Sequence, residues 1–237
     1  MKKIKLITCL TILSFSVSAQ SLLPIRYGVK IGGNLSNIMS TANDGVKNMQ
    51  NASIFGIAGG FYMEIALTDK WYIKPEIIYI QKGASLTSEY THTYDVNQQD
   101  IHNASHELAL AYIELNPTMS YKTSDKLSID VGPSISLLIT PEYTETDKGD
   151  NDNTSAHEEL PAAVFEEETI DVGINVGLSY YLTKNLVLNS RINTGLLKIG
   201  KISKEISTEG ISGENEVKEN LFELKNSGMV FSAIYLF

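Results

Sequence analysis

The sequence is short of cysteine and of long apolar runs, and it shows almost no helical periodicity. One cysteine, Cys9, occurs among 237 residues. It lies in a segment that we expect to be removed, so the mature chain would form no disulfide and would depend on backbone pairing and burial. The apolar run at residues 6–17 is too short to cross a bilayer as a helix.

Positive charge is also scarce, with 19 lysines and arginines against 28 aspartates and glutamates. This acidic balance argues against nucleic acid as a partner. The chain begins with a lysine-rich stretch, the short apolar run and a small-residue site ending at Ala19. This order is typical of a secretory signal peptide. We therefore predict a cleaved signal peptide at 1–19 and a mature chain at 20–237.

What the mature sequence does have is alternation of apolar and polar residues, which predicts strands. The eight predicted strands cover 26–37, 53–67, 71–86, 107–121, 127–140, 169–181, 186–199 and 221–237. Short turns follow the second, fourth and sixth strands, and long connections follow the first, third, fifth and seventh. Transmembrane barrels have short periplasmic turns and long external loops. The fold class predicted is therefore all-β: an eight-stranded antiparallel up-and-down transmembrane β-barrel with short periplasmic turns and long extracellular loops. Together with the export signal, this predicts a single outer-membrane β-barrel domain at 20–237.

The orientation of the strands follows from their polar faces. These faces combine many small residues with charges of both signs, and we expect the charges to line the lumen: Lys30, Glu64, Lys74, Lys82, Glu76, Glu114, Asp130, Asp171 and Arg191. Buried charges need partners, so near balance suits an interior. In the opposite orientation, a soluble ligand-binding barrel, the same charges would face water. The small residues beside them favour the filled lumen of a narrow barrel.

The last strand carries an outward row of apolar residues in the stretch SGMVFSAIYLF, residues 227–237. We interpret Phe231, Tyr235 and Phe237 as a C-terminal signal for insertion by the barrel-insertion machinery. A buried strand of a soluble sandwich is the alternative. Aromatic residues gather at the strand ends predicted to be periplasmic, as in an interfacial girdle: Tyr27, Trp71, Tyr72, Tyr121, Tyr180, Tyr181, Tyr235 and Phe237.

Catalytic and metal-binding patterns are weak. His92, His102 and His106 share one predicted loop, but that loop lacks helical periodicity and cysteine. The triplet Ser105-His106-Glu107 has the residue types of a hydrolase, yet neighbours on an extended chain point to opposite faces. We therefore predict no enzyme activity, no catalytic site, no cofactor and no metal.

The third predicted loop, residues 141–168, is strongly acidic. Its stretch from Asp147 to Asp152 offers oxygen donors for calcium without the spacing of an EF-hand. Two interpretations stay open: a solvated acidic loop, and a loop that bridges to lipopolysaccharide through divalent cations.

Several stretches, taken in order, resemble the PorT-like outer-membrane β-barrel family of Gram-negative bacteria. They are YGVKIGGNLSNI at 27–38, IKPEIIYIQKG at 73–83, YIELNP at 112–117, VGP at 131–133, and residues 171–177 and 191–196. The resemblance implies an eight-stranded outer-membrane barrel. It also implies that some relatives take part in protein secretion.

Together these features predict a non-enzymatic integral outer-membrane protein with a lumen filled by side chains. It would present acidic loops outside the cell and contact outer-membrane lipid, lipopolysaccharide and envelope or secretion proteins. The alternatives are a small-solute channel and an outer-membrane hydrolase. The inward cluster around Glu76, Glu114 and Arg191 predicts a polar plug rather than an open pore.

Overall fold

The structure is a computed structural model that describes residues 24–42, 47–95, 98–149, 164–208 and 215–237. Eight long strands close into an antiparallel barrel in the order β1-β2-β3-β4-β5-β7-β8-β10, and β10 pairs back onto β1. The strands are β1 (Ile25–Ala42), β2 (Lys47–Ala66), β3 (Trp71–Asp95), β4 (Gln98–Lys122), β5 (Leu127–Gly149), β6 (Val164–Glu167), β7 (Ile170–Tyr181), β8 (Leu186–Gly195), β9 (Gly200–Thr208) and β10 (Asn215–Leu236). The predicted fold class is confirmed. In these described segments no helix is long and apolar enough to cross a membrane.

The three short turns lie where the sequence predicts them and share one hydrogen-bonding device. The hydroxyl of Thr68 accepts from the amide of Trp71 at 3.0 Å, and that of Thr183 accepts from Leu186 at 2.9 Å. In the middle turn the hydroxyl of Ser124 accepts from Leu127 at 3.2 Å. Each hydroxyl accepts from the backbone amide three residues further on and so stabilises the tight connection.

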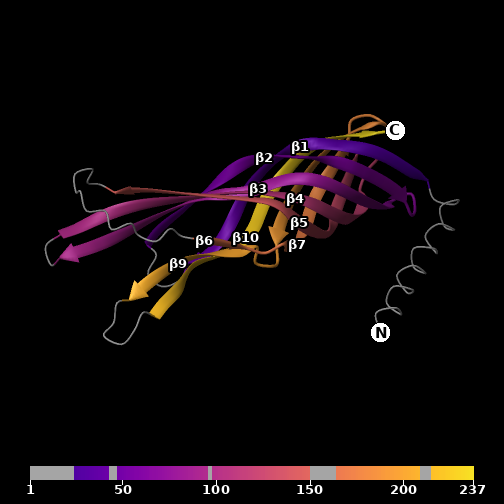
Figure 1. Ribbon diagram of the computed structural model, residues 1–237. Coiled ribbons are helices and arrows are strands. Elements are labelled where there is room, and N and C mark those ends of the chain that lie inside the picture. The colour runs from indigo at the N-terminus through magenta and orange to yellow at the C-terminus, as the bar shows by residue number, and fades with distance from the viewer. Residues whose placement is uncertain (1–23, 43–46, 96–97, 150–163, 209–214) are drawn as a thin grey trace, which may run out of the picture.

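The segments predicted as long loops carry strands instead. β3 and β4 stay paired from Trp71↔Tyr121 to Asp95↔Gln98, so the predicted loop at 87–106 is mostly a hairpin. Two short strands, β6 and β9, lie in the third and fourth predicted loops and extend the sheet from β10. In Figure 1 this β-structure runs on beyond the barrel, opposite the end marked C. Outside hydrocarbon a strand needs no continuous apolar row, so the pattern that marks the barrel strands is absent there.

The outer wall is apolar all around the barrel. Large exposed side chains form continuous rows, for example Ile31 on β1, Phe61 on β2, Ile77 on β3, Ile174 on β7 and Leu188 on β8. Both Ile174 and Leu188 are 44% exposed on this outer face. An apolar band of this kind suits contact with hydrocarbon, so the outward orientation of the apolar face is correct.

Six of the eight aromatic residues predicted for the girdle lie on or beside the outer face, and two do not. Trp71 packs against Tyr121 with ring centroids 4.8 Å apart, and Tyr235 packs edge-on against Phe237 at 5.6 Å. Tyr72 and Tyr181, however, turn into the periplasmic mouth of the barrel. Their placement in the girdle was wrong, because they occupy the inward positions of their strands.

One irregularity lies in the wall between β2 and β3, whose register shifts between Ser53 and Ala58. Side chains of β1 reach across from the interior to serve β3 there. The amide of Asn34 donates to the carbonyl of Gln81 at 2.7 Å, and the hydroxyl of Ser36 accepts from the amide of Gly83 at 2.9 Å. The bulge is thus sealed from the inside by polar side chains.

Candidate functional site: the polar lumen

All nine charged residues predicted to line the lumen lie in the barrel interior. Their exposed fractions run from 1% for Glu114 to 5% for Asp130 and Arg191. The other six are Lys30, Glu64, Lys74, Glu76, Lys82 and Asp171. Strand alternation alone puts these side chains inward, and their opposite charges bring them into contact.

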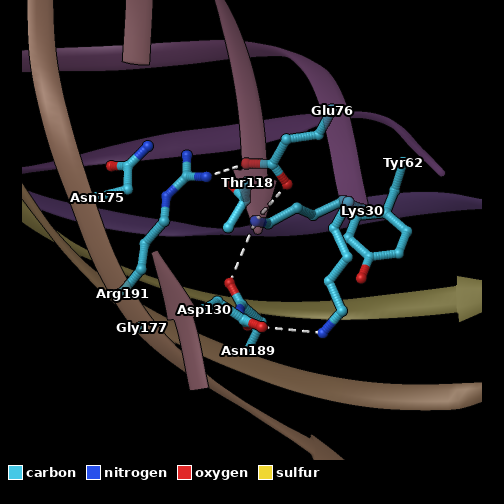
Figure 2. A pocket seen from close by; sticks show the side chains of 10 residues that line it. Lys30, Tyr62, Glu76, Thr118, Asp130, Asn175, Gly177, Asn189 and Arg191 are labelled. Atoms are coloured by element: carbon cyan, nitrogen blue, oxygen red, sulfur yellow. Dashed lines mark hydrogen bonds and ion pairs between the residues drawn. The ribbon is translucent and has the colours of Figure 1, made fainter. Parts of the chain in front are cut away.

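Arg191 of β8 occupies the centre of the lumen and links two carboxylates from the far wall. Its guanidinium contacts Glu76 of β3, and its Nη2 lies 3.0 Å from Oε1 of Glu114 on β4. The amide of Asn116 donates to the same two carboxylates, at 3.0 and 2.9 Å. Figure 2 shows Arg191 and Glu76 reaching toward each other from opposite walls. This contact ties non-neighbouring strands across the barrel.

Two lysines extend the network toward the periplasmic end. Nζ of Lys30 lies 2.8 Å from Glu76 and donates to the amide oxygen of Asn189 at 3.2 Å. Nζ of Lys74 lies 3.0 Å from Asp130, which also accepts from the amide of Asn189 at 3.2 Å. Asn189 therefore joins the two ion pairs into one connected system (Figure 2).

A third lysine extends the network in the other direction. Nζ of Lys82 lies 2.7 Å from Glu114 and 3.5 Å from Asp171. Asp171 in turn accepts from the amide of Asn226 at 2.9 Å, and Asn226 also donates to the hydroxyl of Tyr112 at 3.3 Å. Buried charges are tolerated when they are paired and hydrogen-bonded. Each charged side chain of this cluster has an oppositely charged partner, while Nε of Arg191 donates no hydrogen bond and Oδ1 of Asp171 accepts none among the described residues.

The periplasmic end of the network contains a residue that sequence reasoning missed. Arg26 contacts Glu64, and the hydroxyl of Tyr181 donates to the same carboxylate at 2.6 Å. With Arg26 and Lys82 included, the network holds five cationic and five anionic side chains. The alternation pattern did indicate an inward Arg26, because Arg26 shares its face with Lys30. It was missed because it is the first residue of the predicted strand.

Asparagines also contribute more than the sequence suggested. The amide of Asn193 donates to Asn175 at 2.8 Å, and that of Asn175 donates to Asn116 at 2.7 Å. This relay carries hydrogen bonds from β8 through β7 to β4. A row of asparagines at alternate positions is readable in sequence, but which of them meet depends on the stagger of the strands.

Little open space remains among these side chains. A cavity of about 20 Å³ lies between Lys30, Tyr62, Arg191 and their neighbours, room for about one water molecule.

Beyond the polar network, toward the extracellular side, the interior becomes apolar. Buried aliphatic and aromatic side chains pack together there: Ile38, Ala58, Ile78, Ile80, Ala84, Leu86, Leu108, Leu110, Tyr112, Ile199, Leu224 and Val230. We expected only a polar lumen. The weak alternation of residues 71–86 was the signal, because Ile78 and Ile80 share the inward face with Lys82.

The residues weighed for catalysis do not form a catalytic arrangement. His106 is buried, with its Nδ1 2.8 Å from the hydroxyl of Tyr143, whereas its neighbour Glu107 is exposed on the other face. The side chains of His92 and His102 lie outside the described residues. Within the described part of the chain no three histidine, cysteine or acidic side chains gather as metal ligands.

The acidic third loop is described only in part. Glu142, Glu167 and Glu168 are exposed, while residues 150–163, which include Asp150 and Asp152 of the predicted calcium stretch, lie outside the described residues. The predicted signal peptide at 1–19 lies outside them as well.

The three residues of the predicted insertion signal form a row on the outside of β10. Phe231, Tyr235 and Phe237 are 54%, 51% and 70% exposed. Phe231 and Tyr235 lie in β10, the strand that closes the barrel against β1, where Gly33 pairs with Phe231 and Val29 pairs with Tyr235. Phe237 directly follows the last residue of that strand.

Three solved structures with a similar arrangement are distant in sequence. Neisserial surface protein A is 13% identical, with a TM-score of 0.39, and the match covers 89% of this chain and 97% of that one. OprG from Pseudomonas aeruginosa is 9% identical, with a TM-score of 0.40 and coverage of 90% and 96%. The outer membrane protease OmpT from Escherichia coli is 11% identical, with a TM-score of 0.35 and coverage of 91% and 96%. We draw no functional argument from similarities at this level.

Comparison of sequences is more informative. No curated protein matches the chain significantly. The profile of one family, described as outer membrane protein beta-barrel domain, matches residues 18–200. That range covers most of the chain and most strands of the barrel, and the closed topology, apolar wall and filled lumen agree with it. The chain therefore belongs to the family of outer membrane protein β-barrel domains.

Proposed function

We propose that this protein is a sealed, non-enzymatic barrel of the PorT-like kind that interacts with other components of the cell envelope. The observation that carries the proposal is the lumen itself. A charge-balanced network fills its middle, and an apolar cluster fills its extracellular part. An interior occupied in this way holds no substrate and conducts none, so the protein acts through its surfaces.

Planar-bilayer recording tests this proposal against the small-solute channel. The purified barrel should give no stable open conductance at rest. The variant Arg191→Ala should also stay closed, because the apolar cluster around Leu108 and Leu110 remains in place. A reproducible open level of the unmodified protein would reject the sealed barrel and favour the channel.

The hydrolase alternative is tested at His106 and Glu107. We propose no catalysis, because these side chains lie on opposite faces of β4 and His106 contacts Tyr143 in the interior. Any hydrolase activity of the purified protein should therefore survive Glu107→Gln. An activity that disappears with this substitution would support the enzyme instead.

The extracellular and lipid contacts form the second part of the proposal. The exposed acidic side chains, such as Glu142 and Glu168, would meet lipopolysaccharide through divalent cations, since both surfaces are negative. A calcium titration of the barrel in lipopolysaccharide-containing bilayers, followed by hydrogen exchange, should increase protection of the strands beyond the barrel. Unchanged protection would remove the cation bridge.

Export and assembly complete the proposal. Residues 1–19 would direct export and be removed, and the aromatic row of β10 would be recognised by the barrel-insertion machinery. Determination of the N-terminus of the protein purified from membranes should find Gln20. An N-terminus at Met1 would contradict cleavage.

A further inference from the structure

The periplasmic mouth of the barrel holds a pocket that the sealed lumen does not use. Its volume is about 560 Å³, within the usual range of ligand pockets. We call it the periplasmic vestibule. Its lining includes Arg26, Glu64, Leu67, Asp69, Tyr72 and Lys122.

The vestibule is a dead end. Glu64 lies on its inner side and is held by Arg26 and by the hydroxyl of Tyr181 at 2.6 Å. Arg26 is fixed in addition by donating to the carbonyl of Lys184 at 2.8 Å. These contacts neutralise the carboxylate and close the way to the polar network, so a group entering the vestibule would be bound rather than transported.

Lys122 gives the vestibule a preference for anions. Its Nζ lies over the rings of Tyr72 and Tyr181, 5.8 and 5.5 Å from their centroids. No carboxylate of the described residues lies within ion-pair distance of it, in contrast to Lys30, Lys74 and Lys82 of the lumen. The two rings hold the ammonium group in place at the wall while its charge stays available to an anion.

The rest of the lining limits what that anion can be attached to. Pro24, Ala66, Leu67 and the ring of Tyr72 offer apolar surface beside the ammonium group. The short turns at this end carry Lys70, Lys126 and Lys184 against Asp69 and Asp125, so their balance is positive and favours negative charge from the periplasm.

We propose that the periplasmic vestibule binds a carboxylate carried on a short, partly apolar peptide segment of a periplasmic protein, with Lys122 as the group that pairs with it. The inference rests on the proposed function, because it assigns one of the surfaces through which a sealed barrel would act. It names the face, the recognising residue and the chemistry of the partner.

The test uses the mature barrel in lipid nanodiscs and two dye-labelled pentapeptides, read by fluorescence anisotropy. One peptide has a glutamate between alanine and leucine residues, and the other has glutamine in its place. The glutamate peptide should bind saturably and should weaken as salt is raised. Lys122→Gln should weaken it about fivefold or more, and the exposed turn variant Lys126→Gln less than about twofold.

A second variant guards against misfolding. Leu67 is 38% exposed at the vestibule wall, so Leu67→Asp should leave the barrel folded and still abolish binding by repulsion. Equal binding of both peptides, equal effects of the two lysine variants, or absence of saturable binding would overturn the proposal. Preference for cell-wall fragments over the glutamate peptide would also overturn it, because the source would not be a protein. An open conductance would instead reject the sealed barrel and leave the binding result standing.

Discussion

Replacement of Arg191 by methionine is the sharpest perturbation of the polar lumen. Methionine keeps much of the length of the side chain but removes the guanidinium that joins Glu76 to Glu114. Removing one partner of a buried ion pair costs about 3–5 kcal/mol, because a charge is left without compensation.

The structure places the expected cost at the lower end of this range. Glu76 keeps Lys30 at 2.8 Å and the amide of Asn116 at 3.0 Å. Glu114 keeps Lys82 at 2.7 Å and the hydroxyl of Ser136 at 2.9 Å. Neither carboxylate is left bare, so Arg191→Met should lower the free energy of unfolding by about 3 kcal/mol, roughly a hundredfold in the folding equilibrium constant.

Reversible urea unfolding in liposomes measures this change, with the heat-dependent gel mobility of the folded barrel as the readout. The matched control is Lys126→Met, which removes a positive charge from an exposed turn and should change stability by no more than about 0.5 kcal/mol. The double variant Arg191→Met with Glu76→Gln should recover part of the loss, because one uncompensated charge is gone. A loss for Arg191→Met no larger than that of Lys126→Met would refute the view that the network holds the walls together.

Three further substitutions test the wall and the closing strand. Tyr235→Ala combined with Phe237→Ala removes two exposed aromatic side chains at the end of the chain. The double variant should lower the assembled fraction recovered from outer membranes, while the purified chain still refolds; unchanged recovery would exclude an insertion signal there. Ile174→Arg places a charge near the middle of an apolar outer row and should cost about 2–4 kcal/mol in urea unfolding, whereas a loss below about 1 kcal/mol would place this position outside hydrocarbon. Gly83→Ala should cost about 1–3 kcal/mol in the same assay, since an added Cβ would lie 1.9 Å from the carbonyl oxygen of Leu108 at a φ of +150°; wild-type stability would show that the wall relaxes there.

Sequence reasoning succeeded where one physical rule acts alone. Alternation fixes which side chains of a strand face inward, so the sequence alone was enough to place Lys74 and Glu76 in the lumen. Turn chemistry likewise located the three short connections. Alternation does not mark a strand outside the membrane, because both of its faces can be polar there. The extension of β3 and β4 to Asp95 and Gln98 therefore left no apolar row to read.

Partners inside the lumen were unpredictable for a different reason. Which inward side chains meet depends on the stagger of the strands around the closed barrel. Arg191 and Glu76 lie 115 positions apart in the chain and on strands that do not pair. Nothing local in the sequence indicates that contact, nor that Tyr181 would donate to Glu64 across the periplasmic mouth.

The charged side chains of the lumen help to fix the register of the strands, even though their net contribution to stability is modest. Replacing buried ion pairs by well-packed apolar residues is often neutral for stability, so stability alone does not explain charges in the barrel interior. If both faces of β3 were apolar, however, a one-residue slip would move Ile77 inward at little cost. With the charges in place the same slip moves Lys74 and Glu76 to the lipid-facing side, where the cost of a lysine rises from about 0–1 kcal/mol near the interface to about 2–4 kcal/mol at the midplane. The charges therefore penalise each wrong register while the outer wall stays free to be uniformly apolar, and the network across the lumen completes the pairing only when every strand is in register.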